Sequence, residues 1–266
     1  MQIIKSNNKA LSILRAGQQS FSSSGFIKPA AAEASLPPSI AGTTLEMYIS
    51  PDSQVYSDAG VTPIADTEAI YQVNDLSSNG IIASQAVGSE QLIYSSDVFG
   101  AGLNGFRKSG TDNMELDTTL SFGSTEDYIV FSVFKRSDSG NNGIIGSHIG
   151  NNSSILDWGS GTVYYFTTAG TYVNFATSWS TNLVVRAYRV DESDTGTIYA
   201  YENGTQIGST AITIGGGANF DRIFNRSNKD GTGVTDFGDL AVYRGAFSPT
   251  DVATVTDWFK DKYGIV

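Results

Sequence analysis

Short apolar runs separated by glycine-rich and polar turns fill the chain from residue 44 to residue 214. Runs of this length with β-branched and aromatic residues are typical of β-strands, and no amphipathic helices alternate with them. Many short strands without intervening helices predict an all-β, antiparallel β-sandwich of the jelly-roll type. The predicted strands cover residues 45–49, 81–86, 91–94, 105–116 with a break at 109–110, 128–134, 143–146, 154–158, 162–168, 171–177, 183–190, 197–201, 205–208, 211–214 and 240–243.

Two of these runs carry further information. Residues 128–134 are apolar on both faces, which places this strand centrally, between the sandwich core and a further covering layer. Asn203 and Gly204 separate residues 197–201 from residues 205–208. Asn-Gly supplies the two positive-φ positions of a type I′ turn, so we predict a tight hairpin there.

The last part of the chain carries the clearest helix pattern. Ser248 is a good N-cap, Pro249 suits the first helical position, and Asp251 stands where a capping-box acid belongs. Apolar residues then recur at three- and four-residue spacing and predict one buried face. Gly264 is a natural stop. The sequence therefore predicts one short C-terminal helix that closes the β-domain.

The first part of the chain differs from the rest. Residues 1–42 include a polar stretch and an Ala- and Pro-rich stretch, and we predict an extended N-terminal arm followed by a sandwich domain over residues 43–266. The arm is either a flexible leader or a segment that orders on a partner subunit. In the second case its apolar residues anchor it there, namely Ile3, Ile4, Leu11, Ile13 and Leu14.

Composition narrows the function classes. Hydrophobic residues make up 40% of the 266 positions and charged residues 16%, with a net charge of −11. This charge argues against binding to nucleic acid or to anionic membranes, because both require a basic surface. The sequence has no cysteine, so disulfides and cysteine-containing zinc sites are excluded. We find neither a signal peptide nor an apolar run long enough to span a bilayer.

Four segments resemble, in order, motifs of the concanavalin A-like, laminin-G-like modules found in phage and bacterial structural proteins. They are YQVNDLSSNG at residues 71–80, GFRKSGTDNMEL at 105–116, YENG at 201–204, and residues 238–264, which begin GDLAV and end KYG. The resemblance covers residues 44–264 in pieces. It implies a β-sandwich with glycan or protein binding, and it does not imply an enzyme. Val242 departs from the pattern, because family members often have an acid there.

The same fold hosts laminarinase-type glycosidases, which act through paired carboxylates. Glu115 and Asp117 share one face of a strand and begin the pattern of such enzymes, but its third acid is absent. His148 is the only histidine, and no nucleophile-elbow sequence accompanies it. We therefore expect no enzyme, with a glycosidase using Glu115 and Asp117 as the least favoured function.

Two groups of residues are candidates for ligand binding. The acidic run Asp191-Glu192-Ser193-Asp194 can hold Ca²⁺ through carboxylate oxygens, although a solvated turn is the favoured interpretation and we expect no cofactor. Trp158, Tyr172 and Trp179 belong to an aromatic-rich segment. Exposed aromatic rings can stack on sugar faces, whereas buried ones only fill the core.

These observations lead to two main functional hypotheses. The first is a non-enzymatic phage virion protein, a capsid decoration, head fibre or tail component, whose arm contacts capsid or tail subunits. The second is a glycan-binding adhesion module that recognises host surface glycans. Both predict a homo-oligomer on a particle or cell surface, without nucleic acid or membrane as a partner.

Overall fold

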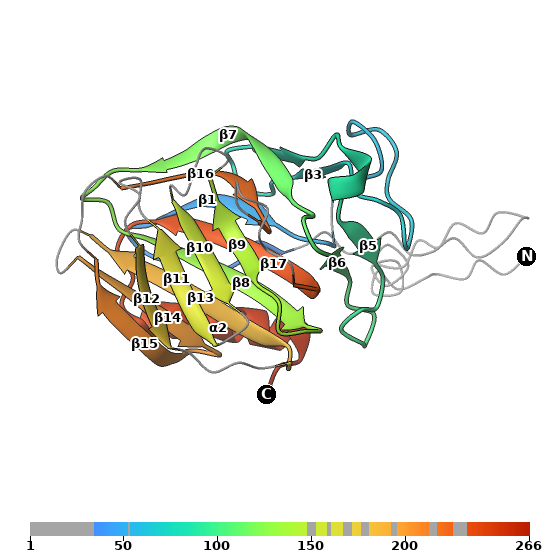
Figure 1. The fold of residues 1–266 in the computed structure, drawn as a ribbon. Coiled ribbons are helices and arrows are strands. Elements are labelled where there is room, and N and C mark those ends of the chain that lie inside the picture. The colour runs from blue at the N-terminus through green and yellow to red at the C-terminus, as the bar shows by residue number, and fades with distance from the viewer. Residues whose placement is uncertain are drawn as a thin grey trace, which may run out of the picture. The chain divides into compact units, whose positions relative to one another are not determined.

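The computed structural model describes residues 35–52, 54–147, 153–158, 161–166, 172–176, 181–192, 196–212, 217–225 and 233–266. In these residues two antiparallel sheets pack face to face, and the C-terminal helix lies against the outer face of one of them (Figure 1). The predicted all-β sandwich with one C-terminal helix is confirmed. No helix in the described part of the chain is long and apolar enough to cross a membrane.

The first sheet, here called the helix-covered sheet, has the strand order β15-β14-β13-β8-β17-β6-β5, with β1 also paired to β17. Its central strand β8 is buried on both faces, as the apolar run predicted. The strands are β1 Thr44–Ile49, β5 Ile93–Ser95, β6 Gly105–Lys108, β8 Tyr128–Arg136, β13 Val184–Asp191, β14 Thr197–Glu202, β15 Thr205–Ala211 and β17 Thr235–Arg244.

The second sheet has the order β12-β11-β10-β9-β16-β7-β4-β3-β2. In Figure 1 its strands β9 to β12 lie in front of β8, β13 and β14. The edge strands β12 and β15 of the two sheets lie close together. The strands are β2 Val55–Tyr56, β3 Gln72–Asn74, β4 Ile82–Ser84, β7 Met114–Phe122, β9 Asn142–Gly146, β10 Ser154–Trp158, β11 Thr162–Phe166, β12 Tyr172–Ala176 and β16 Ala218–Ile223, and a short 3₁₀ helix, η1 Gly88–Glu90, follows β4.

Two apolar clusters hold these layers together. The larger one fills the space between the sheets and includes Val130, Phe134, Tyr165 and Val242, none of them more than 1% exposed. Val242, which replaces the acid expected from the resemblance, is thus a core residue. The second cluster lies between the helix-covered sheet and helix α2, Pro249–Tyr263, where Phe131 packs against Phe259. Burial of apolar surface on both sides of β8 is the main stabilising contribution.

Helix α2 begins and ends as its sequence predicts. The Ser248 hydroxyl accepts a hydrogen bond from the Asp251 amide, and the Asp251 carboxylate accepts one from the Ser248 amide. Gly264 adopts a left-handed conformation with φ 63° and terminates the helix. The Asn203-Gly204 hairpin is also confirmed, because both residues have positive φ, 49° and 84°.

Several sequence predictions need correction. Residues 105–116 are not one interrupted strand, because β6 belongs to the helix-covered sheet and β7 to the second sheet. The turn at Ser109-Gly110 therefore leads the chain from one layer to the other. The sequence pattern does not predict strand β16, because its Asp221 and Arg222 obscure the apolar pattern. Of the strand predicted over residues 211–214, Ala211 is the last residue of β15, and residues 213 and 214 lie outside the described residues.

Residues 35–42 precede the first strand and lie on the domain surface. The Tyr243 hydroxyl donates a hydrogen bond to the Pro38 carbonyl over 3.0 Å, and Ile40 packs against the cluster beneath helix α2. The apolar arm residues Ile3, Ile4, Leu11, Ile13 and Leu14 lie outside the described residues. Anchoring by the arm and its boundary at residue 42 therefore stay predictions.

Candidate functional site

The aromatic-rich segment forms three neighbouring strands at one edge of the second sheet. Strands β10, β11 and β12 pair in antiparallel order, with Tyr165 opposite Ile155 and Val173. Tyr165 is fully buried, and its hydroxyl shares a 2.6 Å hydrogen bond with that of Tyr128 in the inter-sheet core. Because strand side chains alternate, Tyr164 lies on the opposite, outward face.

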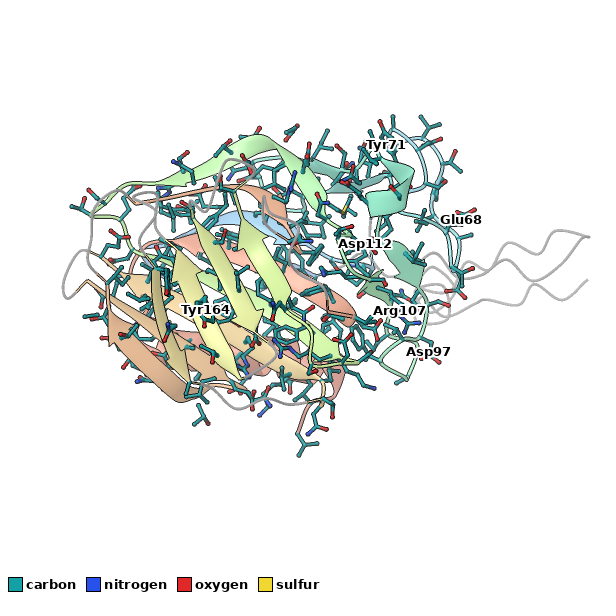
Figure 2. All side chains as sticks on the ribbon, viewed as in Figure 1. Glu68, Tyr71, Asp97, Arg107, Asp112 and Tyr164 are labelled. Carbon is teal, nitrogen blue, oxygen red and sulfur yellow. The ribbon has the colours of Figure 1, made fainter. Side chains whose placement is uncertain are left out.

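Two tyrosines meet on this outward face. The rings of Tyr164 and Tyr172 have centroids 5.8 Å apart and planes inclined by 42°. Tyr172 is 56% exposed, more than any other aromatic side chain whose burial the structure describes. Asn174 stands opposite Tyr164 in the register and is exposed as well. We call this surface, formed by Tyr164, Tyr172 and Asn174, the tyrosine face; Figure 2 shows Tyr164 on it.

The three aromatic residues predicted as ligand contacts have different outcomes. Tyr172 is exposed, as stacking on a ligand requires. Trp158 lies in β10 opposite Thr162, at the end of the strand that neighbours the tyrosine face. Trp179 lies outside the described residues. The sequence pattern did not single out Tyr164 or Asn174 as ligand contacts, although alternation along β11 and β12 assigns both to the face that carries Tyr172.

Strand β10 is fixed to the helix-covered sheet by charged groups inside the sandwich. The Asp157 carboxylate forms an ion pair with the Arg136 guanidinium over 2.8 Å and lies 4.0 Å from the Arg186 guanidinium. Arg186 is also 2.7 Å from Glu202. Asp157 and both arginines are at most 3% exposed. These four residues, the buried charge network, link β10 to β8, β13 and β14 and so support the tyrosine face from behind.

The carboxylates considered for glycosidase chemistry serve structural contacts. Glu115 and Asp117 both lie exposed on β7, on one face as expected. Glu115 is 2.6 Å from the guanidinium of Arg222 on the neighbouring strand, and Asp117 accepts a hydrogen bond from the Ile82 amide over 2.9 Å. Both acids therefore join strands of the second sheet. His148 lies outside the described residues.

The acidic run considered for Ca²⁺ is described only in part, because Ser193 and Asp194 lie outside the described residues. Asp191 is 3.8 Å from Arg189, and the Glu192 amide donates a hydrogen bond to the Asp127 carboxylate. Within the described ranges, no group of three or more His, Cys, Asp or Glu side chains is placed to hold a metal ion. The Ca²⁺ site stays a prediction without structural support.

Glu192 gives the domain a testable pH dependence. Burial, and to a lesser extent the charge of Asp127, raises the pKa of Glu192 to about 7. The folded state therefore holds a proton between about pH 4.5 and 7 that the unfolded state releases, so stability falls as the pH rises through this window. We expect Glu192→Gln to abolish this fall and, at pH 8, to raise the free energy of unfolding by about 1–2 kcal/mol, after allowance for solvent screening.

Urea unfolding of both proteins from pH 4 to pH 8 measures this effect. Glu68→Gln provides a matched control, because it removes the charge of a glutamate whose side chain is exposed. Glu68 is labelled at the right of Figure 2. If the parent protein is equally stable at pH 5 and pH 8, or if both substitutions act alike, the ionisation assigned to Glu192 is wrong.

Comparisons with known proteins support the fold. No protein-family model and no curated protein sequence matches the chain. Among solved structures, the binding domain of Paraclostridial Mosquitocidal Protein 1 is similar, with a TM-score of 0.57 and 12% identity over 81% of this chain. The botulinum neurotoxin serotype D binding domain is similar with a TM-score of 0.52 and 11% identity over the same share. The chain spans about half the length of these two structures, 52% of each.

A third similar structure is matched over nearly its whole length. It is domain 4 of AbnA, a GH43 extracellular arabinanase from Geobacillus stearothermophilus, in complex with arabinotriose. The TM-score is 0.52 and the identity 14%, over 81% of this chain and 99% of that domain. The first two solved structures are binding domains and the third is a domain of an arabinanase, and none is described as a virion component. The chain thus shares the β-sandwich fold of these domains.

Proposed function

We propose that this chain is a non-catalytic carbohydrate-binding module and that the tyrosine face contacts the sugar. The observation that carries the proposal is the exposure of Tyr172, 56%, on a sheet face where Tyr164 stands beside it. An exposed aromatic ring costs free energy in water and is favoured where it covers an apolar ligand surface. Sugar rings offer such a surface on their C–H faces, and the Asn174 side chain can hydrogen-bond to their hydroxyl groups.

Two further observations support this proposal. The carboxylates Glu115 and Asp117 are engaged in inter-strand contacts, which favours binding over hydrolysis. Domain 4 of the arabinanase, whose fold the chain matches over 99% of that domain's length, was solved in complex with arabinotriose. Arabinotriose is therefore a suitable first probe for this protein.

Removal of one ring tests the proposal. We expect Tyr172→Ala to weaken carbohydrate binding about 5- to 10-fold, because stacking of one aromatic ring contributes on the order of 1–1.5 kcal/mol. The ligand is identified on a glycan array that includes arabinotriose, and its affinity is then measured by isothermal titration calorimetry. Tyr172 is exposed, so its removal leaves the core intact.

Tyr71→Ala is the matched control. Tyr71 is half-buried and lies at the other end of the domain from Tyr164 (Figure 2). The Tyr71→Ala substitution should leave the affinity for the carbohydrate unchanged. An array without any bound glycan, or equal affinities of the Tyr172→Ala and parent proteins, contradicts binding at the tyrosine face.

A role in a phage particle remains a prediction. It includes capsid or tail subunits as partners, a homo-oligomeric state, and the absence of nucleic acid and membrane partners. The experiment that tests it is deletion of residues 1–40, which should abolish incorporation into particles if the arm anchors the protein. Carbohydrate binding and a particle location are compatible with each other.

A further inference from the structure

A second concave surface lies away from the tyrosine face, beside strand β7, and is lined by residues of both sheets. It is an open pocket of about 320 Å³. This volume is at the small end of the range for ligand sites and fits a ligand of one or two sugar rings. We call it the Glu46 cleft; its lining residues are Glu46, Asn79, Ile81, Thr118, Thr119, Leu120, Ser121 and Arg244.

Thr118 shows that the inter-sheet core ends at this cleft. Along β7 the residues Leu116, Leu120 and Phe122 point inward and are at most 8% exposed. Thr118 lies between Leu116 and Leu120 but is exposed, at the point where the pairing of β7 with β16 shifts register. A polar side chain is unfavourable in a dry core, and the Thr118 side chain instead lines the solvent-accessible pocket.

A β-bulge directs Glu46 towards the same pocket. The pairing of β1 with β17 shifts register between Leu45 and Met47, so that Glu46 is the extra residue. Met47 packs in the inter-sheet core, whereas Leu45 packs against the cluster beneath helix α2. Bulges commonly redirect side chains beside functional sites. Here the redirected carboxylate accepts hydrogen bonds from Arg244 over 2.8 Å and from the Asn79 side chain over 3.1 Å.

Arg244 forms a rigid wall of the cleft. Besides Glu46, its guanidinium contacts the Glu126 carboxylate over 2.6 Å and the Ser121 carbonyl over 2.8 Å. It also stacks on the Phe122 ring, 4.6 Å from the ring centroid. A side chain held by this many contacts is preorganised, so it loses little conformational freedom when a ligand binds.

Other polar groups of the cleft are available to a ligand. The hydroxyl groups of Thr118 and Thr119 and the amide oxygen of Asn79 make no hydrogen bond to the protein within the described residues, and all three residues are exposed. The Arg244 charge is balanced by Glu46 and Glu126. With a net charge of −11 on the whole chain, the protein does not attract an anion to this site.

We propose that the Glu46 cleft is a second saccharide-binding site, which takes one neutral sugar residue independently of the tyrosine face. Sugar hydroxyl groups both donate and accept hydrogen bonds. They therefore match the mixture of carboxylate, amide oxygen and threonine hydroxyls found here. The inference shares its ligand class with the proposed function but rests on a different set of residues. Strand β7 is separated from β11 by three strands of the second sheet, roughly 19 Å at the usual strand spacing.

Amide chemical shifts test this site directly. The ¹⁵N-labelled full chain is titrated separately with L-arabinose, D-galactose and D-glucose. We expect saturable shifts of the Asn79, Thr118 and Thr119 amides with at least one of these sugars. Thr118→Val keeps the side-chain shape and removes the hydroxyl. The affinity for the sugar that shifts these amides should therefore fall about three- to tenfold, which corresponds to the loss of one hydrogen bond. Thr44→Val, at an exposed threonine outside this cleft, should have no effect.

The outcomes separate this site from the tyrosine face. Tyr172→Ala should leave the Glu46 cleft titration unchanged, and Thr118→Val should leave arabinotriose binding at the tyrosine face unchanged. Shifts in the cleft without any response near Tyr172 support the second site and contradict the proposed function. The second site is overturned if none of the three sugars moves the cleft amides, if Thr118→Val binds as tightly as the parent, or if Tyr172→Ala abolishes the cleft response.

Discussion

Asp157→Asn should lower the free energy of unfolding by about 3–5 kcal/mol, a large share of the total stability of a domain. The substitution preserves the size of the side chain and removes its charge. Arg136 and Arg186 then stay inside the sandwich, each 2% exposed, with Glu202 as the remaining carboxylate of the network. Two buried cations balanced by one anion carry an uncompensated desolvation cost, which explains the size of the expected effect.

Urea denaturation followed by tryptophan fluorescence measures the loss. Asp191→Asn is the matched control, because Asp191 also pairs with an arginine, at 3.8 Å, but is 21% exposed. We expect that control to change stability by less than about 1 kcal/mol. Carbohydrate binding at the tyrosine face should weaken as well, since Asp157 lies in β10, the neighbour of β11. A loss below about 1 kcal/mol for Asp157→Asn would mean that the buried charge network does not hold the sheets together.

Asp239→Asn should cost about 3 kcal/mol and loosen helix α2. Asp239 is fully buried in β17, where its carboxylate accepts hydrogen bonds from the Lys262 ammonium over 2.8 and 3.1 Å and from the Tyr48 hydroxyl over 3.0 Å. Lys262 belongs to the last turn of α2, so this ion pair ties the end of the helix to the sheet. The amide replacement leaves the ammonium without its buried counter-charge.

Two measurements distinguish a local from a global effect. Urea denaturation gives the global loss, and limited proteolysis with detection of C-terminal cleavage reports the release of α2. Asp52→Asn is the control, because Asp52 contacts the same ammonium over 3.0 Å but is 24% exposed. It should cost less than about 1 kcal/mol. Equal losses for the two variants would show that the burial of Asp239 is not what gives this contact its strength.

The candidate site was only partly predictable from the sequence. The aromatic-rich segment indicated where a sugar-contacting surface can lie, and Tyr172 is exposed as stacking requires. Alternation also required Tyr164 and Tyr165 to face opposite ways. Which of the two faces solvent depends on the position of the other sheet, and the Tyr165–Tyr128 hydrogen bond shows that Tyr165 faces it. The residues of the Glu46 cleft come from β1, the 77–81 turn, β7 and β17, so no local pattern groups them.

Local chemistry determined the elements of this protein. The apolar run of β8, the Asn203-Gly204 turn and the caps of α2 act over a few neighbouring residues, so their structures follow from the sequence alone. Tertiary packing decided the rest. The chain changes sheets between β6 and β7, and the charged residues Asp157, Arg186 and Asp239 are buried. Charged side chains usually remain in water, and only partners far away in the sequence make their burial tolerable. Both binding surfaces proposed here depend on residues far apart in the sequence, because the buried charge network supports the tyrosine face and Arg244 holds Glu46 in the cleft.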